Sequence, residues 1–284
     1  MTERLADVTA RIEGIRQLGA VINAMRGIAA ARAQQARNQL TAVDGYAMII
    51  AAAISSAVAP LPSDRQDSAA RSTRCGLVLF CAEEGFAGTF SERILDAAGD
   101  DLTTSDLFLV GTRGATAAAE RNILPRWKSA MPSHSLGVPK LADAIAEALY
   151  VRIATGGISA LDAIFSRWRP GEGTHVERRR LFPLDRATFA HPSNRDAPLL
   201  NLSPEMLLSE LTADYMHAQL CHAALHAFAA ENEARMEAMT SARYQVERQL
   251  SSLQATQRTV RQEEITAEII ELAAGEIASR STST

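Results

Sequence analysis

Residues 211–260 read LTADYMHAQLCHAALHAFAAENEARMEAMTSARYQVERQLSSLQATQRTV and contain no proline. One series recurs at every seventh position, with Met236 and Leu250 at companion positions; its members are Leu211, Ala218, Leu225, Asn232, Met239, Val246, Leu253 and Val260. A seven-residue repeat is typical of a helix that packs along its length against another helix. Upstream, Ser203 is a candidate N-cap and Pro204 suits the first helical position. We therefore predict one helix of about 75 residues, roughly 110 Å long.

A second stretch without proline covers residues 3–58. Its apolar residues alternate at spacings of three and four, as in a coiled-coil seam with Gly19 as a gap; they are Leu5, Val8, Ile12, Ile15, Ile22, Met25 and Ala29. This pattern predicts another helix, of roughly 80 Å. The arginines of this helix face a more acidic third region, so the helices should attract each other; they are Arg4, Arg11, Arg16, Arg26, Arg32 and Arg37. Two long helices that bracket a compact domain can meet only by running antiparallel.

The middle of the chain has a different apolar period. A polar linker with Pro60 and Pro62 is expected over residues 59–74. Short apolar runs at 75–82 and 105–111 are typical of buried parallel strands, and each is followed by a helix-compatible segment. We expect a further helix at 138–154 and two later strands at 158–168 and 175–184, around the turn RPGEGT. This alternation predicts a small doubly wound sheet.

The composition limits the classes of partner. The chain has 284 residues, 47% of them hydrophobic, and a net charge of -4, so we expect a folded protein without general attraction to nucleic acid. The N-terminus has no apolar core of a secretory signal. The longest apolar run, AMIIAAAISSAVA at 47–59, is shorter than the ~18 residues of a membrane span. We therefore expect no direct membrane insertion, and any connection to a membrane through a partner.

The cysteines and histidines give weak indications of chemistry. Cys75, Cys81 and Cys221 form no CxxC pair, and we expect small core residues in a reducing compartment. His222 and His226 have the i, i+4 spacing that two metal ligands on a helix would use. No glutamate follows His222 as in a zincin, and the nearest third candidates lie on preceding turns. We favour surface or seam histidines over a metal site.

The turn EEGFAG, residues 83–88, follows the first predicted strand, where phosphate-binding turns lie in doubly wound folds. It matches neither GxGxxG nor GxxxxGK[ST], and Glu83 and Glu84 would repel a phosphate. We interpret it as a structural turn or a contact surface. No cofactor and no catalytic residue is predicted from the sequence.

The end of the chain, VRQEEITAEIIELAAGEIA at 260–278, is also strongly helical. Ile265, Ile269, Leu272 and Ile277 recur at helical spacing, and glutamates fill the rest of the circumference. The second long helix outlasts the first by several turns. We therefore expect another polypeptide to cover this apolar face.

Three stretches together resemble the gamma subunit of F-type ATP synthases, the central rotor shaft. They are VTARIEGIRQLGAVINAMRGIAAAR (8–32), ENEARMEAM (231–239) and VRQEEITAEIIELAAG (260–275). The resemblance implies a long antiparallel coiled coil of the N- and C-terminal helices (1–58 and 201–284) with an inserted Rossmann-like α/β domain (75–200). It also implies a noncatalytic subunit that couples ion flow through the membrane ring to conformational cycling of the catalytic ring.

Some segments depart from the family pattern. EEGFAGTF (83–90) replaces a turn with a cysteine and paired glycines, TSARYQ (240–245) replaces an ATDNA-like segment, and ATQRTV (255–260) replaces an asparagine-rich one. These differences indicate a divergent paralogue, as in the alternative F-type ATPase that is similar to sodium-translocating forms. The membrane ring, not this chain, sets the coupling ion.

The resemblance also implies partners and contact residues. The partners are the alpha and beta subunits, the epsilon subunit and the c-subunit membrane ring, at the cytoplasmic face of the bacterial inner membrane. Contacts with the alpha and beta ring are carried over to Met25, Arg26, Arg235, Gln262, Thr266 and Ile269. The inserted domain would face the membrane ring and the epsilon subunit.

Two other functions stay open at this point. In one, the sheet domain is a nucleotide-dependent enzyme with helical dimerisation arms, and the turn at 83–88 is its only support. In the other, the chain is a self-associating coiled-coil scaffold. Nucleotide binding would indicate the enzyme, and a discrete dimer held through residues 260–278 would indicate the scaffold.

Overall fold

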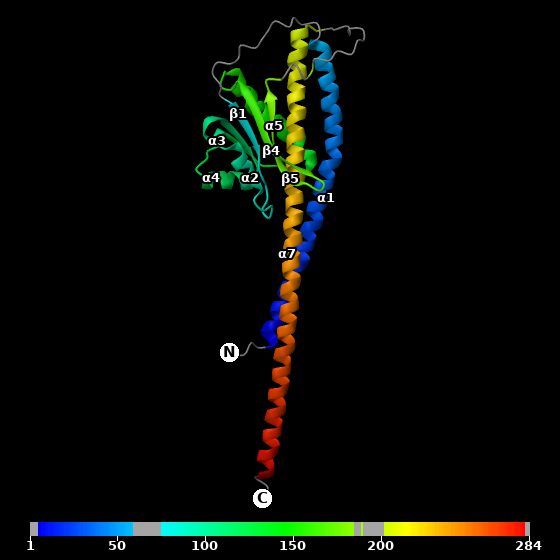
Figure 1. Cartoon of the computed structure of the whole chain (residues 1–284), viewed down its shortest axis with the longest axis vertical. Coiled ribbons are helices and arrows are strands. Elements are labelled where there is room, and N and C mark those ends of the chain that lie inside the picture. The colour runs from blue at the N-terminus through cyan, green and yellow to red at the C-terminus, as the bar shows by residue number, and fades with distance from the viewer. Residues whose placement is uncertain (1–4, 59–74, 185–188, 190–201, 282–284) are drawn as a thin grey trace. The chain divides into compact units, whose positions relative to one another are not determined.

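A computed structural model of the chain describes residues 5–58, 75–184, 189 and 202–281. The chain divides into two compact units, residues 1–28 with 236–284 and residues 29–235. Helices α1 (Leu5–Val58) and α7 (Pro204–Ser281) each contribute to both units as unbroken helices (Figure 1). Both predicted long helices are therefore confirmed. The Ser203 hydroxyl accepts a hydrogen bond from the Met206 N–H at 3.3 Å, as expected of an N-cap.

The first unit is an antiparallel helix pair. Ile22 of α1 packs with Met239 and Val246 of α7. Gly19 is the predicted gap in the seam, and Val246 packs close to it: a Cβ at position 19 would lie 3.3 Å from a methyl carbon of Val246. Nearer the N-terminus, the Gln257 amide donates to the Thr9 hydroxyl at 2.9 Å. The residue numbers rise along one helix as they fall along the other, which confirms the antiparallel prediction.

Burial along both helices follows the predicted seam. Six members of the seven-residue series on α7 are less than 9% exposed, and one of them, Asn232, is polar. They are Ala218, Leu225, Asn232, Met239, Val246 and Val260. On α1, Val8, Ile12, Ile22 and Ala29 are buried in the same way. The heptad pattern therefore predicted which side of each helix is covered.

The second unit contains a five-stranded sheet of order β3-β2-β1-β4-β5. Its strands are β1 (Cys75–Phe80), β2 (Asp106–Val110), β3 (Trp127–Ser129), β4 (Ala160–Arg169) and β5 (Gly173–Phe182). The first four are parallel, and β5 runs antiparallel to β4. The four predicted strands are confirmed. Sequence reasoning missed β3, whose three residues are too few to show an alternating pattern.

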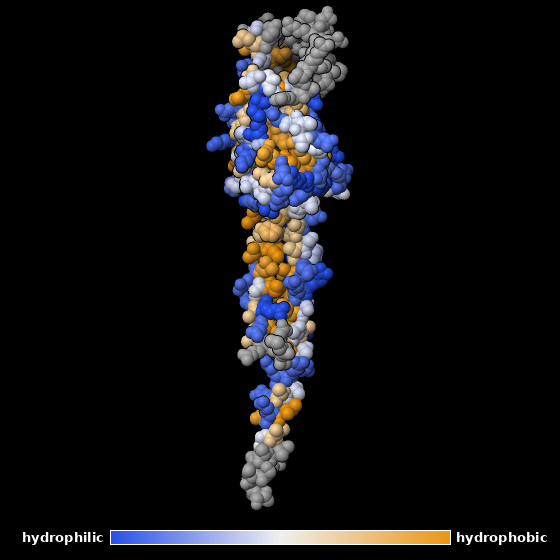
Figure 2. All heavy atoms as spheres, turned by 90° about the vertical axis from the view of Figure 1, so that its left-hand side faces the viewer, coloured by the Kyte–Doolittle hydropathy of each residue, from blue (hydrophilic) through white to orange (hydrophobic). Residues whose placement is uncertain are grey.

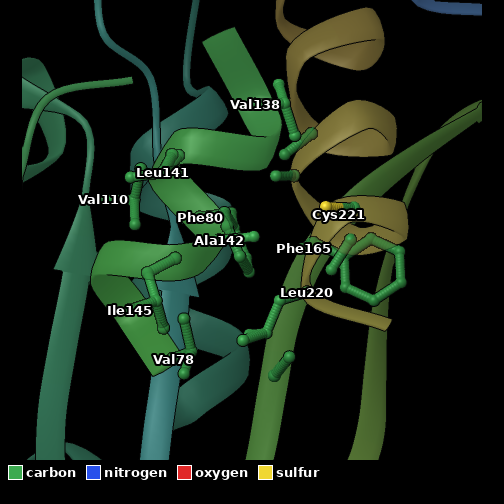
Figure 3. Packing of buried hydrophobic residues seen from close by; sticks show 14 of the residues in the cluster. Val78, Phe80, Val110, Val138, Leu141, Ala142, Ile145, Phe165, Leu220 and Cys221 are labelled. Atoms are coloured by element: carbon green, nitrogen blue, oxygen red, sulfur yellow. The ribbon is translucent and has the colours of Figure 1, made fainter. Parts of the chain in front are cut away.

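Helices cover both faces of this sheet. Helices α2 (Phe90–Ala98) and α4 (Thr112–Glu120) pack on one face over Leu77, Leu79 and Ile164. Helix α5 (Val138–Ala154) packs on the other face with parts of α1 and α7, and Figure 3 shows Leu141 of α5 beside Val110 of β2 and Ile145 beside Val78 of β1. Short helices α3 (Asp101–Thr104) and η1 (Ser135–Gly137) complete the described elements. The predicted doubly wound arrangement is confirmed.

The cysteines contribute to packing. Cys81 and Cys221 are buried, and burial raises the pKa of each thiol to about 12. Cys75 is half-buried, and all three are free. A thiol with so high a pKa is a poor nucleophile and metal ligand near neutral pH. The prediction of small core residues is confirmed for Cys81 and Cys221.

Within the described part of the chain, α1 is the one helix that is long and apolar enough to cross a membrane, by length and composition alone. The sequence had suggested that its apolar run is too short for a span. Part of that run is used inside the second unit, where Ile50 and Ile54 are buried against Phe189. These apolar residues therefore contribute to a core of the folded chain.

Candidate functional site

The turn at 83–88 connects β1 to α2 and is held by two carboxylates of the chain itself. Its backbone includes Phe86 at φ 62° and Gly88 at φ 61°, both in the left-handed region. A non-glycine residue in this region costs free energy unless the surroundings hold it there. The contacts around Glu83 and Glu231 provide that restraint.

Glu83 binds the ends of two neighbouring strands. Its carboxylate accepts hydrogen bonds from the Thr112 N–H at 2.9 Å, the Thr112 hydroxyl at 2.6 Å and the Met131 N–H at 2.8 Å. Thr112 is the first residue of α4, so the carboxylate lies at a helix N-terminus, where free N–H groups and the helix dipole favour an anion. A side chain of the protein thus occupies a position that suits a phosphate.

Glu231 of α7 binds the first two N–H groups of the same turn. Its Oε1 accepts from the backbone N–H of Glu83 at 3.2 Å and of Glu84 at 3.1 Å. Glu231 is 3% exposed, and burial raises the pKa of its carboxyl, whereas the Arg235 charge and the two N–H donors act in the opposite direction. Two of the N–H groups that could hold a phosphate after β1, those of Glu83 and Glu84, are therefore already satisfied.

Arg235, a predicted partner contact, is buried in this cluster with 4% of its surface exposed. Its guanidinium donates to Glu231 at 2.5 Å, to the Asn232 side-chain oxygen at 3.0 Å and to the backbone oxygen of Gly85 at 3.2 Å. The residue thus ties α7 to the turn inside the second unit. Its contact with a catalytic ring stays a prediction.

Helix α1 reaches the same cluster through its arginines. Arg32 bonds the Glu84 carboxylate at 3.2 Å, and Arg37 forms an ion pair with Glu233 of α7. The latter pair is one instance of the predicted attraction between a basic first helix and an acidic third region. Arg4, another of the predicted basic residues, lies outside the described residues.

Met25 and Arg26, two further predicted contacts, lie in the first unit. Met25 packs beside the Ile22, Met239 and Val246 cluster. Among the described residues, Arg26 Nε is a buried nitrogen for which no hydrogen-bond partner is found. A buried donor without a partner is costly. Met25 thus has a packing role within the pair, and Arg26 retains unused hydrogen-bonding capacity.

The predicted contacts Gln262, Thr266 and Ile269 lie on the last part of α7. All side chains from 261 to 275 are exposed, and the Thr266 hydroxyl bonds the Gln262 carbonyl at 2.8 Å. The large apolar side chains there are 51–69% exposed; they are Ile265, Ile269, Ile270 and Leu272. Figure 2 shows hydrophobic residues beside hydrophilic ones on the surface of this end of the helix. An apolar stripe of this kind is typical of a surface that another protein covers.

His222 and His226 are buried in the seam between α7 and the sheet. Arg179 bonds His222 Nδ1 at 3.1 Å and can only donate, so the His222 proton lies on Nε2, which contacts His226 Nε2 at 3.1 Å. Asp44 of α1 lies 3.4 Å from His222 Nε2, and Phe165 stacks on His226. Burial lowers the pKa of His222 to about 3 and of His226 to about 4. Both imidazoles are therefore neutral near neutral pH, as expected of seam histidines.

The described residues contain no group of three or more histidine, cysteine, aspartate or glutamate side chains that could hold a metal ion. His217, a third candidate beside the pair, instead bonds Asp143 at 3.0 Å. Sequence reasoning did not identify the cluster of Glu83, Glu231 and Arg32. The one available signal was the polar run Glu231, Asn232 and Glu233 within an otherwise apolar seam.

Comparison with known proteins gives consistent results over the full length. A family model described as ATP synthase matches residues 4–278. The ATP synthase gamma chain of Beutenbergia cavernae is 27% identical over 284 residues, which cover 93% of this chain and 94% of the relative. That of Chlorobium limicola is 26% identical, with 95% and 97% covered.

Solved structures share the fold at low identity. The rotor of the Euglena gracilis mitochondrial ATP synthase in rotational state 1 has a TM-score of 0.65 at 13% identity and covers 92% of this chain and 98% of its own. The central stalk and c-ring structure of the Tetrahymena thermophila enzyme has a TM-score of 0.57 at 18% identity, with 78% and 99% covered. Because the family model matches nearly all of the sequence, the chain belongs to this ATP synthase family, and the relatives that it resembles are gamma chains.

Proposed function

We propose that this chain is the central rotor shaft, or gamma subunit, of an F-type ATP synthase. It couples ion flow through a membrane ring to conformational cycling of the catalytic alpha and beta ring. The observation that carries the proposal is the exposed apolar stripe on residues 261–275 of α7. Such a stripe at the end of a long helix is suited to enclosure by other polypeptides.

The mechanism follows from symmetry. A single shaft inside a ring of three catalytic pairs cannot contact all three pairs in the same way, because one asymmetric object breaks threefold symmetry. Each catalytic site is therefore held in a different conformation, and rotation of the shaft passes these conformations around the ring. Such a shaft must be stiff, and the packed seam of Ile22, Met239 and Val246 supports that requirement.

In this proposal the subunit has no catalytic site of its own. The Glu231 carboxylate occupies the N–H groups of Glu83 and Glu84 after β1, and the Glu83 carboxylate occupies those of Thr112 and Met131 after β2 and β3. These contacts support the rotor over the nucleotide-dependent enzyme, for which the turn at 83–88 was the only support. Equilibrium binding of ATP, ADP and NAD to the isolated chain checks this point, and micromolar affinity for any of them would favour the enzyme.

The proposed partners are the alpha and beta subunits, the epsilon subunit and the c-subunit ring, at the cytoplasmic face of a bacterial inner membrane. Six residues of this chain contact the alpha and beta ring in this proposal; they are Met25, Arg26, Arg235, Gln262, Thr266 and Ile269. The departures at 83–90, 240–245 and 255–260 support a divergent paralogue, as in the alternative, sodium-type-like F-type ATPase. Purification of the complex from its native membrane, followed by identification of the subunits, tests the set of partners.

Deletion of residues 262–284 tests the placement of the helix end. We expect weaker assembly with the alpha and beta ring and lower coupled turnover, because the apolar stripe is lost. The unfolding midpoint of the isolated chain should hardly change, since the described side chains removed are exposed. Unchanged assembly and coupling would contradict the placement. Light scattering tests the scaffold alternative, which a discrete dimer held through residues 260–278 would support.

A further inference from the structure

The α/β module of the second unit is attached to α1 and α7 by two kinds of contact. Apolar residues of β1, β4 and α5 pack against α7 in one continuous cluster. Apolar packing is strong but has no preferred direction along a helix. Directional contacts are therefore needed if the module is to keep one position on the helices under load.

The turn at 83–88 provides such directional contacts. On the α7 side, Glu231 accepts from the N–H groups of Glu83 and Glu84, and Arg235 donates to the Gly85 carbonyl. On the α1 side, Arg32 bonds the Glu84 carboxylate. On the module side, Glu83 binds the N-terminus of α4 and the N–H of Met131, two positions after the end of β3.

Burial makes the centre of this network strong. Glu231 and Arg235 are 3% and 4% exposed, so their ion pair is little screened by water. Each accepts or donates further hydrogen bonds, so neither charge is left without a partner. The exposed Phe86 at the tip has a left-handed backbone, and Arg235 holds the carbonyl of the preceding Gly85.

We propose that the 83–88 turn is a clasp that locks the α/β module to α1 and α7, so that the module and the two helices turn as one body. The proposal rests on the rotor function and specifies how torque passes between the helices and the module. Glu231 is the positioning residue of the clasp, because it alone binds two N–H groups of the turn together with a buried arginine. Arg179 of β5, which bonds Gln219 and His222 of α7, is a second attachment that keeps the module folded when the clasp is weakened.

The first arm of the test uses the isolated full chain. Glu231→Gln removes the charge at nearly constant volume, and hydrogen exchange of the Glu83 and Glu84 amides is measured. We expect exchange to become about tenfold faster, because these N–H groups lose a charged acceptor. Glu247→Gln is the matched control, since Glu247 forms an exposed pair with Arg243 four residues away on the same helix. Unchanged exchange of the Glu83 and Glu84 amides in Glu231→Gln would overturn the clasp.

The second arm uses the assembled complex in inverted membrane vesicles. The number of ions pumped per ATP hydrolysed should fall in Glu231→Gln and in Glu84→Gln, and should be unchanged in Glu247→Gln. Glu84→Gln removes the charge that pairs with Arg32 and, at 3.8 Å, with Arg235. Glu84→Gln keeps the test decisive if Glu231→Gln folds poorly. Faster exchange with unchanged pumping would overturn the mechanical role. Absence of the wild-type chain from the complex would overturn the rotor assignment itself, whereas the exchange result would still decide whether the turn is held by Glu231.

Discussion

At the scale of single residues, Gly114 sets how closely α4 approaches the end of β1. A Cβ at this position would lie 2.0 Å from Cys81 Cβ and 3.4 Å from Cys81 Cα. Both residues are in the buried part of the second unit, where neighbours cannot move away without disturbing the sheet.

Gly114→Ala should therefore lower the free energy of unfolding by about 1–3 kcal/mol, as overpacking in a core does. Urea unfolding of the isolated chain measures the change. Gly45→Ala on α1 is the matched control, because a Cβ there meets no atom within 4 Å. That variant should be stabilised by roughly 0.5–1 kcal/mol, since alanine is the better helix former. Equal effects in the two variants would contradict the packing argument.

His222 and His226 predict a pH dependence of stability. Their pKa values in the folded chain, about 3 and about 4, are below the ordinary value of 6.5. As the pH falls from 7 to 5, the unfolded chain takes up protons that the folded chain refuses, so the free energy of unfolding decreases. Below pH 6.5 the loss should approach roughly 1.4 kcal/mol per pH unit for each histidine.

The measurement is the slope of unfolding free energy against pH between 7 and 5. Replacing both residues, His222→Gln with His226→Gln, should flatten the slope even if it lowers stability at pH 7. A wild-type slope near zero would show that the pair is not held neutral in the folded chain.

At the scale of helices and strands, the helix pair of the first unit depends on a few buried apolar contacts. Ile22→Ala should lower the unfolding free energy by about 2–4 kcal/mol, because the cavity lies against Met239 and Val246. Ile28→Ala is the control on the same helix, since Ile28 is 54% exposed and should change stability by less than about 0.5 kcal/mol. Thermal unfolding followed by circular dichroism compares the two. A similar loss in both would contradict the assigned seam.

The sequence predicted these elements well where one period persists. The heptads on α7 and the apolar runs of β1, β2 and β4 carry their own signal, because burial repeats at a fixed spacing. Strand β3 carries none, since its three residues are ordered by pairing with β2. The clasp is similar: Glu83 and Glu231 are 148 residues apart, and only the folded chain brings them together. For the same reason the sequence did not predict that Arg235, carried over as a contact with the alpha and beta ring, forms a buried ion pair with Glu231.

At the scale of the whole molecule, the chain is the shaft of a rotary assembly, and its exposed helix end should govern association. Ile265→Ser with Ile269→Ser should weaken binding to the alpha and beta ring by at least about tenfold, because two isoleucines would no longer be buried on assembly. The isolated variant should unfold like the wild type, since both side chains are 51–60% exposed. Co-purification with the ring measures the effect, and Glu263→Gln with Glu268→Gln serves as the exposed control pair. Undiminished co-purification of the serine variant would contradict an apolar bearing surface.

The hydrogen bond from the Leu5 N–H to Glu264, at 3.3 Å, marks a mechanical transition. On one side of it α7 is braced by a neighbour across a packed seam, whereas the described side chains from 265 to 275 are open to solvent all around. Two helices that pack side by side resist bending far more than a single helix does, because bending the pair would stretch one helix and compress the other. Elastic deformation should therefore concentrate in the last turns, which can act as a compliant spring between a rigid shaft and its bearing.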